Sequence, residues 1–302
     1  GLYNYLKIKK HSVTVIAPND YPDFLNWLHG NNKVVNASVS GLQAAKKIKA
    51  ADIIFCLDFN ALSRIGELGK EIAGTAAVKV IIDHHQQPED FADYLLHNVK
   101  SSSTCELIYD FIQLMGDTKK IDKKIAECLY TGIMTDTGSF RFPSTSAKTL
   151  KITAALVEAG ANNSEIHNRI FDDNTEDRLK LLGHALVEKM VVLKEYNAAY
   201  ITLTNEELDR FNFKKGDTEG LVNYPLSIRG IKFSVFIVEK DGIIKMSFRS
   251  KGKFDVNTFA RQYFSGGGHK NAAGGASNLS LEATVNKFLE ILPLYKTELI
   301  GQ

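Results

Sequence analysis

The chain has 302 residues, of which 44% are hydrophobic and 24% are charged. These values are ordinary for a globular protein, and the length is sufficient for two domains with separate cores. The 37 basic and 35 acidic side chains leave a formal net charge of +2, which excludes a chain-wide surface for long duplex nucleic acid, so any phosphate site must be local.

The three cysteines, Cys56, Cys105 and Cys128, lie in apolar segments without a Cys-x-x-Cys spacing. They indicate buried free thiols, and we expect a cytoplasmic protein. No apolar run approaches the ~20 residues that a membrane helix needs, so no membrane partner is expected. The first residues do not resemble a signal peptide. They lack a Met and begin inside a helical pattern, so we expect further residues upstream of Gly1.

Short apolar runs alternate with helical patterns over the first part of the chain. The predicted elements are a strand at 13–17, helices at 21–29 and 41–50, a strand at 53–57, a helix at 64–72 and a strand at 78–82. Such alternation predicts a parallel sheet with helices on both faces.

The pattern then becomes helical. Helices are predicted from Ser103 or Thr104 to about Met115, from Asp122 towards Ile133, from Ser146 to Ala159, and from Asn174 to about Met190. The first three begin at side chains that can cap a helix, and Gly160 follows the third as a C-cap. The fourth is long and amphipathic, as expected for a helix that connects two domains.

Alternating strands dominate the rest of the chain. Strands are predicted at 199–202, 231–239 and 243–249, with Asp241-Gly242 as a hairpin turn, and a final helix is predicted at 281–292. The fold class is therefore α/β, with a parallel-sheet domain at 1–171, a linker helix at 172–190 and a smaller α/β domain with a mixed sheet at 191–302.

Acidic and imidazole side chains follow two of the predicted strands. Asp83, His84 and His85 come directly after the third strand, and Asp58 comes directly after the second. Strands of one parallel sheet present their carboxyl ends on the same edge, where ligands bind. A carboxylate there can bridge two cations. Asp58 alone could instead cap a helix, and the triplet could be a polar strand end.

A third acidic residue, Asp136, lies among small hydroxyl residues after the helix that begins at Asp122. It could be part of an ordinary helix end and turn. It would also supply another hard oxygen ligand to the sheet edge. Oxygen-rich sites with one imidazole favour Mn²⁺ or Mg²⁺ over zinc.

The second domain contains a possible phosphate loop, SGGGHK at 265–270. Three consecutive glycines allow backbone N–H groups to approach an anion closely, and His269 and Lys270 would add donors and charge. A flexible surface loop is the alternative. Arg249-Ser250-Lys251 forms a second basic cluster, which on its own would be typical of a solvated face.

Four segments together resemble the DHH phosphoesterase superfamily with its DHH-associated C-terminal domain. They are LDFNALSRIG at 57–66, IIDHH at 81–85, TGIMTDTGSFRF at 131–142 and SFRSKGKFDVNTFARQYFSGGGHKNAAGG at 247–275. Their order matches as well as their content. The subgroup that the chain resembles most is the bacterial oligoribonuclease (nano-RNase)/3′-phosphoadenosine-5′-phosphate (pAp) phosphatase type.

The resemblance implies a role for each matching position in the first domain. Asp58 would bridge two Mn²⁺ ions, with Mg²⁺ as an alternative, and His84 and Asp136 would bind the second ion. Asp83 would support catalysis by orienting ligands, and His85 would contact the scissile phosphate. In the second domain and beside the first site, the matching substrate contacts are Gly266, Gly267, Gly268, His269, Arg249, Ser250 and Arg64.

Two departures accompany the resemblance. The first motif of the family, His-x-Asn-Pro-Asp-x-Asp, supplies three ligands to one metal and is absent here, and the segment 1–18 resembles the stretch that comes after this motif in relatives. We therefore expect the chain to begin after that motif. The family also has a glycine where this chain has Ser265, a small residue that still permits the turn.

The implied activity is hydrolysis of dinucleotides to about pentamers, or of pAp, to mononucleotides. Hydroxide held by two metals would attack phosphorus in a cleft between the two domains, and a homodimer is possible. One alternative is an inorganic pyrophosphatase or exopolyphosphatase, because a related family shares the catalytic domain. The other is a non-catalytic nucleotide-binding module, if the first motif is truly absent from the protein.

Overall fold

The computed structural model describes residues 1–240 and 242–301. The chain folds into two compact units, Gly1–Asp173 and Asn174–Gln302. The predicted hairpin turn includes Asp241, which lies outside the described residues. Within the described residues, no helix is both long enough and apolar enough to cross a membrane.

The strands of the first unit are parallel, as predicted. They are β1 (Val15–Ala17), β2 (Val34–Asn36), β3 (Ile53–Leu57), β4 (Val78–Asp83) and β5 (Tyr94–His97). β1 pairs with β2, and β4 lies between β3 and β5 in a separate sheet. β2 and β5 were not predicted, because each is too short to show a strand period.

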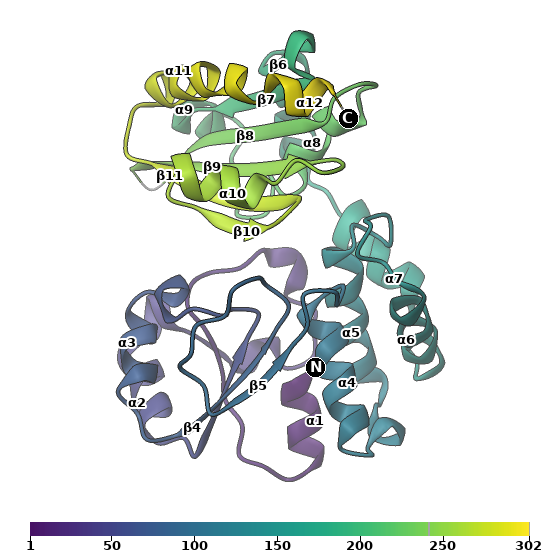
Figure 1. The fold of residues 1–302 in the computed structure, drawn as a ribbon. Coiled ribbons are helices and arrows are strands. Elements are labelled where there is room, and N and C mark those ends of the chain that lie inside the picture. The colour runs from purple at the N-terminus through teal and green to yellow at the C-terminus, as the bar shows by residue number, and fades with distance from the viewer. Residues whose placement is uncertain (241, 302) are drawn as a thin grey trace. The chain divides into compact units, whose positions relative to one another are not determined.

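Helices cover both faces of the sheet β3-β4-β5 (Figure 1). The helices of this unit are α1 (Leu2–Ile8), α2 (Ala37–Lys49), α3 (Glu67–Ala73), α4 (Thr104–Leu114), α5 (Lys123–Asp136), α6 (Ala147–Glu158) and α7 (Asn163–His167). Of these, α6 and α7 pack on α5 and not directly on the sheet. On β4, Ile81 packs with residues of α2 and α3, while Ile82 packs into the core formed with α1, α4 and α5. Successive strand residues point to opposite faces, so this alternation produces the three layers.

The predicted helix starts after residue 100 are confirmed by side-chain caps. Ser103 accepts a hydrogen bond from the N–H of Glu106, and Asp122 caps α5 in the same way. Ser146 forms a capping box with Thr149 at the start of α6. These caps occupy N–H groups that the first helical turn leaves unpaired.

The predicted helix at 21–29 is wrong. The segment contains one short 3₁₀ helix, Asp23–Leu25, which is followed by turns. The Asn26 side chain donates to Asp23 Oδ1 and accepts from the Asn31 side chain. Such local side-chain hydrogen bonds compete with helix formation.

The second unit is built on one mixed sheet in the order β10-β11-β9-β8-β7-β6. Its strands are β6 (Met190–Leu193), β7 (Ala198–Leu203), β8 (Phe233–Lys240), β9 (Ile243–Ser250), β10 (Gly267–His269) and β11 (Ala272–Ser277). β7 and β8 are parallel, and the other neighbouring pairs are antiparallel.

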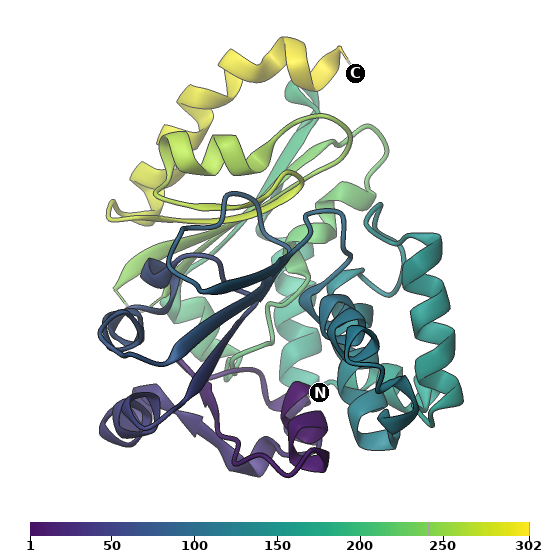
Figure 2. The same cartoon turned by 60° about the horizontal axis from the view of Figure 1, so that its bottom comes forward.

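Helices also cover both faces of this mixed sheet. They are α8 (Glu176–Val187), α9 (Asn205–Arg210), α10 (Val256–Tyr263), α11 (Leu281–Ile291) and α12 (Lys296–Ile300). Phe233 and Phe248 form an aromatic core with α10 and α11, whereas Phe236 packs with α8 and α9 on the opposite face. In Figure 2 the yellow C-terminal helices run along the sheet of their own unit.

Candidate metal and phosphate site

Asp58 and Asp83 lie side by side at the carboxyl edge of the first sheet. Leu57 of β3 is in register with Ile82 of β4. The residues that follow them, Asp58 and Asp83, are therefore neighbours across the two strands. Asp58 has φ +63°, and its N–H donates to the carbonyl oxygen of Ile82 at 3.2 Å. A left-handed backbone at a non-glycine residue is strained and is characteristic of functional sites.

Asp58, His84 and Asp136 converge at this edge. His84 Nε2 lies 3.5 Å from Asp58 Oδ1 and 3.7 Å from Asp136 Oδ2. Asp136 is the last residue of α5, and its side chain is 45% exposed, so α5 delivers it to the sheet edge with one side open to solvent. One ligand atom from each of the three lies within 4.8 Å of the others.

His84 is held through its other ring nitrogen. Nδ1 lies 3.1 Å from the carbonyl oxygen of Ser101, which accepts the ring proton. A proton fixed on Nδ1 makes Nε2 the ligand atom for a metal. The ring itself is buried, with 8% of the side chain exposed.

The charged groups of this cluster shift one another's pKa values. Burial alone would raise the pKa of Asp58, but the His84 imidazole and the Thr104 hydroxyl outweigh it and lower that pKa below its usual range. Desolvation and the neighbouring Asp58 charge raise the pKa of Asp136 to about 6. Desolvation would lower the pKa of His84, but the two carboxylates raise it. A cation placed among these groups would relieve the repulsion between the carboxylates.

The donor set fits a hard divalent cation. Two carboxylates and one imidazole suit Mn²⁺ or Mg²⁺ better than a thiolate-seeking metal. A second group, Asp58, Asp83 and His85, also has ligand atoms within 4.8 Å of one another. Asp58 belongs to both groups.

Asp83 and His85 form a tight pair. His85 Nδ1 is 2.7 Å from Asp83 Oδ1, and the His85 N–H donates to Asp83 Oδ2 at 3.0 Å. Asp83 is completely buried. Burial would raise the pKa of Asp83, but these bonds to His85 lower it. Both carboxylate oxygens of Asp83 thus orient His85.

In the second unit, the predicted glycine loop is a strand. Gly267–His269 form β10, which pairs with β11. The Gly266 N–H donates to the Ala260 carbonyl oxygen, and the Gly268 N–H donates to Asn257 Oδ1 at 2.9 Å. A Cβ on Gly266 would lie 2.0 Å from the carbonyl oxygen of Gly274. Glycine is required at 266 because two backbones approach closely.

The basic cluster lies on β9 of the same sheet. Arg249 pairs with Ala272 of β11, and burial lowers the pKa of its guanidinium. The Ser250 hydroxyl donates to the Phe254 carbonyl oxygen at 2.7 Å and accepts from the Asn271 side chain. Ser250 therefore stabilises the turn that follows β9.

Arg64 lies on a short helix between β3 and α3. It is exposed on the 3₁₀ helix Leu62–Ile65, which precedes α3.

Sequence reasoning missed the residues that hold the cluster. Thr104 Oγ1 donates to Asp58 Oδ1 at 2.7 Å, and His97 Nε2 lies 2.6 Å from the carbonyl oxygen of His85. The sequence pattern indicated Thr104 only as a possible helix cap. The run of hydroxyl residues at 101–104 was the available signal, because four consecutive small polar residues before an apolar helix need buried partners.

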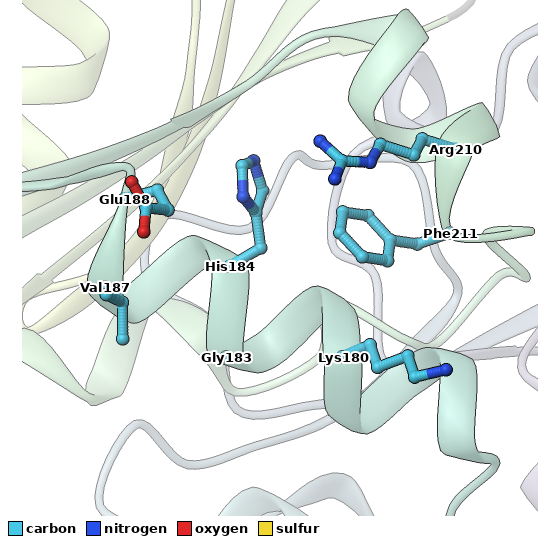
Figure 3. Close-up of a pocket in the computed structure, with 7 residues that line it drawn as sticks. All are labelled: Lys180, Gly183, His184, Val187, Glu188, Arg210 and Phe211. Carbon is cyan, nitrogen blue, oxygen red and sulfur yellow. The ribbon is translucent and has the colours of Figure 1, made fainter.

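A separate open pocket of about 580 Å³ lies in the second unit, between α8 and the end of α9 (Figure 3). It is lined by Lys180, Gly183, His184, Val187, Glu188, Arg210 and Phe211. None of the predicted site residues lines it. His184 is hydrogen-bonded to Glu207 at 3.0 Å, which gives this histidine a structural partner.

Two family models match the two halves of the chain. The DHH family N-terminal domain matches residues 1–133, and the DHHA1 domain matches residues 195–294. A solved structure, an exopolyphosphatase-related protein from Bacteroides fragilis, is 42% identical with a TM-score of 0.92. This similarity covers 99% of this chain and 87% of that chain.

Two relatives share a named activity. The bifunctional oligoribonuclease and PAP phosphatase NrnA of Bacillus subtilis is 35% identical over 196 residues, which are 65% of this chain and 61% of that protein. The protein of the same name from Thermus thermophilus is 27% identical over 291 residues, which are 96% of this chain and 82% of that protein. The match thus spans less than two thirds of the Bacillus subtilis protein.

The fold and the cluster define the class. An α/β unit with carboxylates and imidazoles at its strand ends, followed by a mixed-sheet unit, is the arrangement of a two-domain phosphoesterase. The chain belongs to the DHH family, with a DHH N-terminal domain and a DHHA1 domain.

Proposed function

We propose that the protein hydrolyses short oligonucleotides, from dinucleotides to about pentamers, or pAp, to mononucleotides. The observation that carries this proposal is the convergence of Asp58, His84 and Asp136 in a chain of the DHH family. The NrnA relatives, which are named as oligoribonucleases and PAP phosphatases, support the substrate class. We also propose a bacterial, cytoplasmic enzyme that can form homodimers.

The cluster would hold divalent cations, with two Mn²⁺ ions expected in the complete protein and Mg²⁺ as an alternative. Bound cations would activate a water molecule and neutralise charge on the phosphate. We assign Asp58 the bridging position that its match to the DHH motif implies, because Asp83 and His85 Nδ1 are engaged with each other. His84 and Asp136 would complete one of the two sites.

His85 would act on the phosphate itself. Asp83 holds the ring through Nδ1, and we assign the contact with the phosphate to Nε2. From there His85 can stabilise negative charge that develops on the phosphoryl oxygens. It can also give a proton to the leaving oxygen as a general acid.

The second unit would bind the other end of the same substrate. His269 and Arg249 supply the charge, and Gly266, Gly267 and Gly268 allow close approach of the backbone. The N–H groups of Gly266 and Gly268 already donate hydrogen bonds within the unit. We therefore assign the phosphate contacts chiefly to the side chains. Ser250 would shape this end, and Arg64 would contribute from the first unit.

The test is release of mononucleotides from the dinucleotide pApA, followed by chromatography with and without Mn²⁺. We expect Mn²⁺ to stimulate release and chelation to abolish it. Asp136→Asn should reduce release and Mn²⁺ binding together. A protein that binds Mn²⁺ but releases no mononucleotide from pApA or pAp would contradict the proposal.

A second candidate is hydrolysis of polyphosphate or pyrophosphate. The observation that favours it is the name of the Bacteroides fragilis structure, an exopolyphosphatase-related protein that is 42% identical. Both substrates would use the same metal cluster. Parallel assays with pApA, pAp, pyrophosphate and polyphosphate separate the candidates, and we expect the nucleotides to have the higher kcat/KM.

A further inference from the structure

One short segment contacts two residues of the candidate metal cluster, Asp58 and His84. Residues 101–106 span the end of the connection from β5 and the first turn of α4. The Ser101 carbonyl oxygen accepts the Nδ1 proton of His84 at 3.1 Å, and Thr104 Oγ1 donates to Asp58 Oδ1 at 2.7 Å. Two groups that lie 26 residues apart along the chain are therefore fixed by the same piece of backbone.

The segment is itself held by a buried carboxyl group. Glu106 Oε2 accepts hydrogen bonds from the Ser102 hydroxyl at 2.6 Å, the Ser102 N–H at 3.3 Å and the Thr149 hydroxyl at 2.8 Å. Ser103 caps α4 by accepting from the Glu106 N–H at 3.1 Å. Thr149 belongs to α6, so the segment is tied to a second helix.

This network places polar side chains in the buried interior, where apolar side chains are usual. The segment's exposed fractions are 3% at Ser101, 2% at Ser102, 1% at Ser103, 6% at Thr104 and 2% at Glu106. Burial of polar side chains is costly unless each finds a partner. A fully bonded network in a low-dielectric interior, by contrast, is rigid and fixes the position of the groups it touches.

The two contacts have distinct consequences for metal binding. The Ser101 carbonyl keeps the proton on His84 Nδ1, so that Nε2 is the ligand atom. The Thr104 hydroxyl restrains the carboxylate of Asp58, whose backbone is already in the strained left-handed region. Both ligands are thereby oriented before a cation arrives.

We propose that residues 101–106 are a positioning segment, in which Thr104 orients Asp58 and Ser101 sets the tautomer of His84, with Glu106 as the anchor. The proposal rests on the proposed function only in that the ligand it prepares for is a divalent cation. Thr104 and Glu106 act through other residues and are not assigned a contact with substrate.

The experiment compares Thr104→Val with Thr104→Ser in the full chain. Valine has the shape of threonine without the hydroxyl, and serine keeps the hydroxyl. Mn²⁺ affinity is measured by electron paramagnetic resonance titration. We expect Thr104→Val to weaken Mn²⁺ binding by about 10–100-fold, the range for loss of an outer partner of a metal ligand, and Thr104→Ser to restore most of it.

Thr131→Val is the matched control. Thr131 is also buried in the first unit, with 2% exposed, but its hydroxyl donates to the carbonyl oxygen of Glu127 within α5. This variant should leave Mn²⁺ affinity unchanged. Circular dichroism melting confirms that each variant folds. Wild-type affinity in a folded Thr104→Val protein, or an equal loss in Thr131→Val, would overturn the proposal.

A second measurement is independent of both metal and activity. Nitrogen-15 NMR of the metal-free protein, at a pH where imidazole is neutral, reports which nitrogen of His84 carries the proton. We expect Nδ1–H in the wild type and a mixture of tautomers in Glu106→Gln, whose neutral amide is a weaker acceptor for the three donors. An unchanged tautomer in a folded Glu106→Gln protein would remove Glu106 as anchor, even if Thr104→Val does not fold.

The two readouts also separate this proposal from the proposed function. A chain that binds Mn²⁺ through the segment as described, yet hydrolyses no nucleotide, would sink the function and leave the positioning intact. If the wild-type chain hydrolyses pApA but Thr104→Val binds Mn²⁺ with wild-type affinity, the proposed function stands and the positioning proposal fails.

Discussion

Asp83 and His85 are joined by a side-chain and a backbone hydrogen bond, with the carboxyl group fully buried. Hydrogen bonds to its partners compensate a buried carboxylate for its lost hydration. Removing one partner therefore lowers the free energy of unfolding. The pair therefore couples the stability of the strand end to the position of the imidazole. Substitutions at His85 can separate these two effects.

We predict that His85→Ala and His85→Asn both lower kcat by about 10²–10⁴-fold, the usual contribution of a general acid. The asparagine side chain can still donate to Asp83, whereas alanine cannot. His85→Ala should therefore also lower the free energy of unfolding by about 1–3 kcal/mol, and His85→Asn by less. Steady-state kinetics and urea denaturation measure the two effects. Equal activity of His85→Asn and wild type would contradict the assigned role.

At the scale of single residues, the sequence identified the acidic residues at the strand ends. Asp58 and Asp83 were predicted to meet because parallel strands end on one edge, and the structure places them there. Thr104 is 46 residues from Asp58, and no periodicity links them. The hydroxyl residues at 101–104 indicate that the segment needs buried partners. Hydrogen bonds across such separations depend on tertiary packing, so the sequence did not show that Asp58 is one of these partners.

Among the elements, α9 is held by a network around Glu207. Its carboxyl group forms a capping box with Thr204, contacts Lys189 at 2.8 Å and contacts His184 at 3.0 Å. Burial would raise the pKa of Glu207, but hydrogen bonds, first that from Lys189, lower it to about 2. The ionised group thus stabilises the folded state.

We predict that this stabilisation is fully present above about pH 4.5, the usual value for Glu, and is lost as the pH falls towards 2. The folded state binds the proton more weakly than the unfolded state, so unfolding becomes easier in acid. Glu207→Gln should remove of order 1 kcal/mol at pH 7 and flatten the pH dependence in this range. Urea denaturation between about pH 2 and pH 7 measures it, and an unaltered slope would contradict the prediction.

Strands β10 and β11 offer a matched pair of glycine substitutions. A Cβ on Gly266 would meet the Gly274 carbonyl oxygen at 2.0 Å, whereas the nearest atom to a Cβ on Gly274 is 3.8 Å away. We predict that Gly266→Ala lowers the free energy of unfolding by about 1–3 kcal/mol and that Gly274→Ala does not. Thermal denaturation of both variants checks this, and equal tolerance would contradict the close backbone approach.

At the level of elements, prediction succeeded where caps and periodicity were strong. The starts of α4, α5 and α6 were found because Ser103, Asp122 and Ser146 cap them. It failed at 21–29, where side-chain hydrogen bonds outcompete the helix, and at short strands such as β2 and β10. Three residues are too few for a period, so pairing with neighbours decides such strands.

The whole molecule contains two units with separate cores. One core gathers residues of α1, α4 and α5, and another gathers the phenylalanines of β8, β9 and α11. The proposed metal site lies within the first unit alone. Ligand binding to a folded unit stabilises that unit by mass action.

We predict that Mn²⁺ at about 100 times its Kd adds about 2.7 kcal/mol to the unfolding free energy of the first unit. Hydrogen exchange followed by mass spectrometry should show slower exchange in peptides of β4 and α5. Peptides of α11 should be unchanged, and Asp58→Asn should abolish the effect. Equal protection of both units would contradict a metal site confined to the first.

The mixed sheet carries one parallel pair, β7 with β8, beside the antiparallel pair of β8 with β9. β8 and β9 are adjacent in the chain, but 29 residues separate the end of β7 from the start of β8. Closing a longer loop costs more chain entropy before any contact is gained. During folding, the β8–β9 ribbon and the β6–β7 hairpin, whose strands are only four residues apart, should therefore form first, and the parallel pairing of β7 with β8 should join them later.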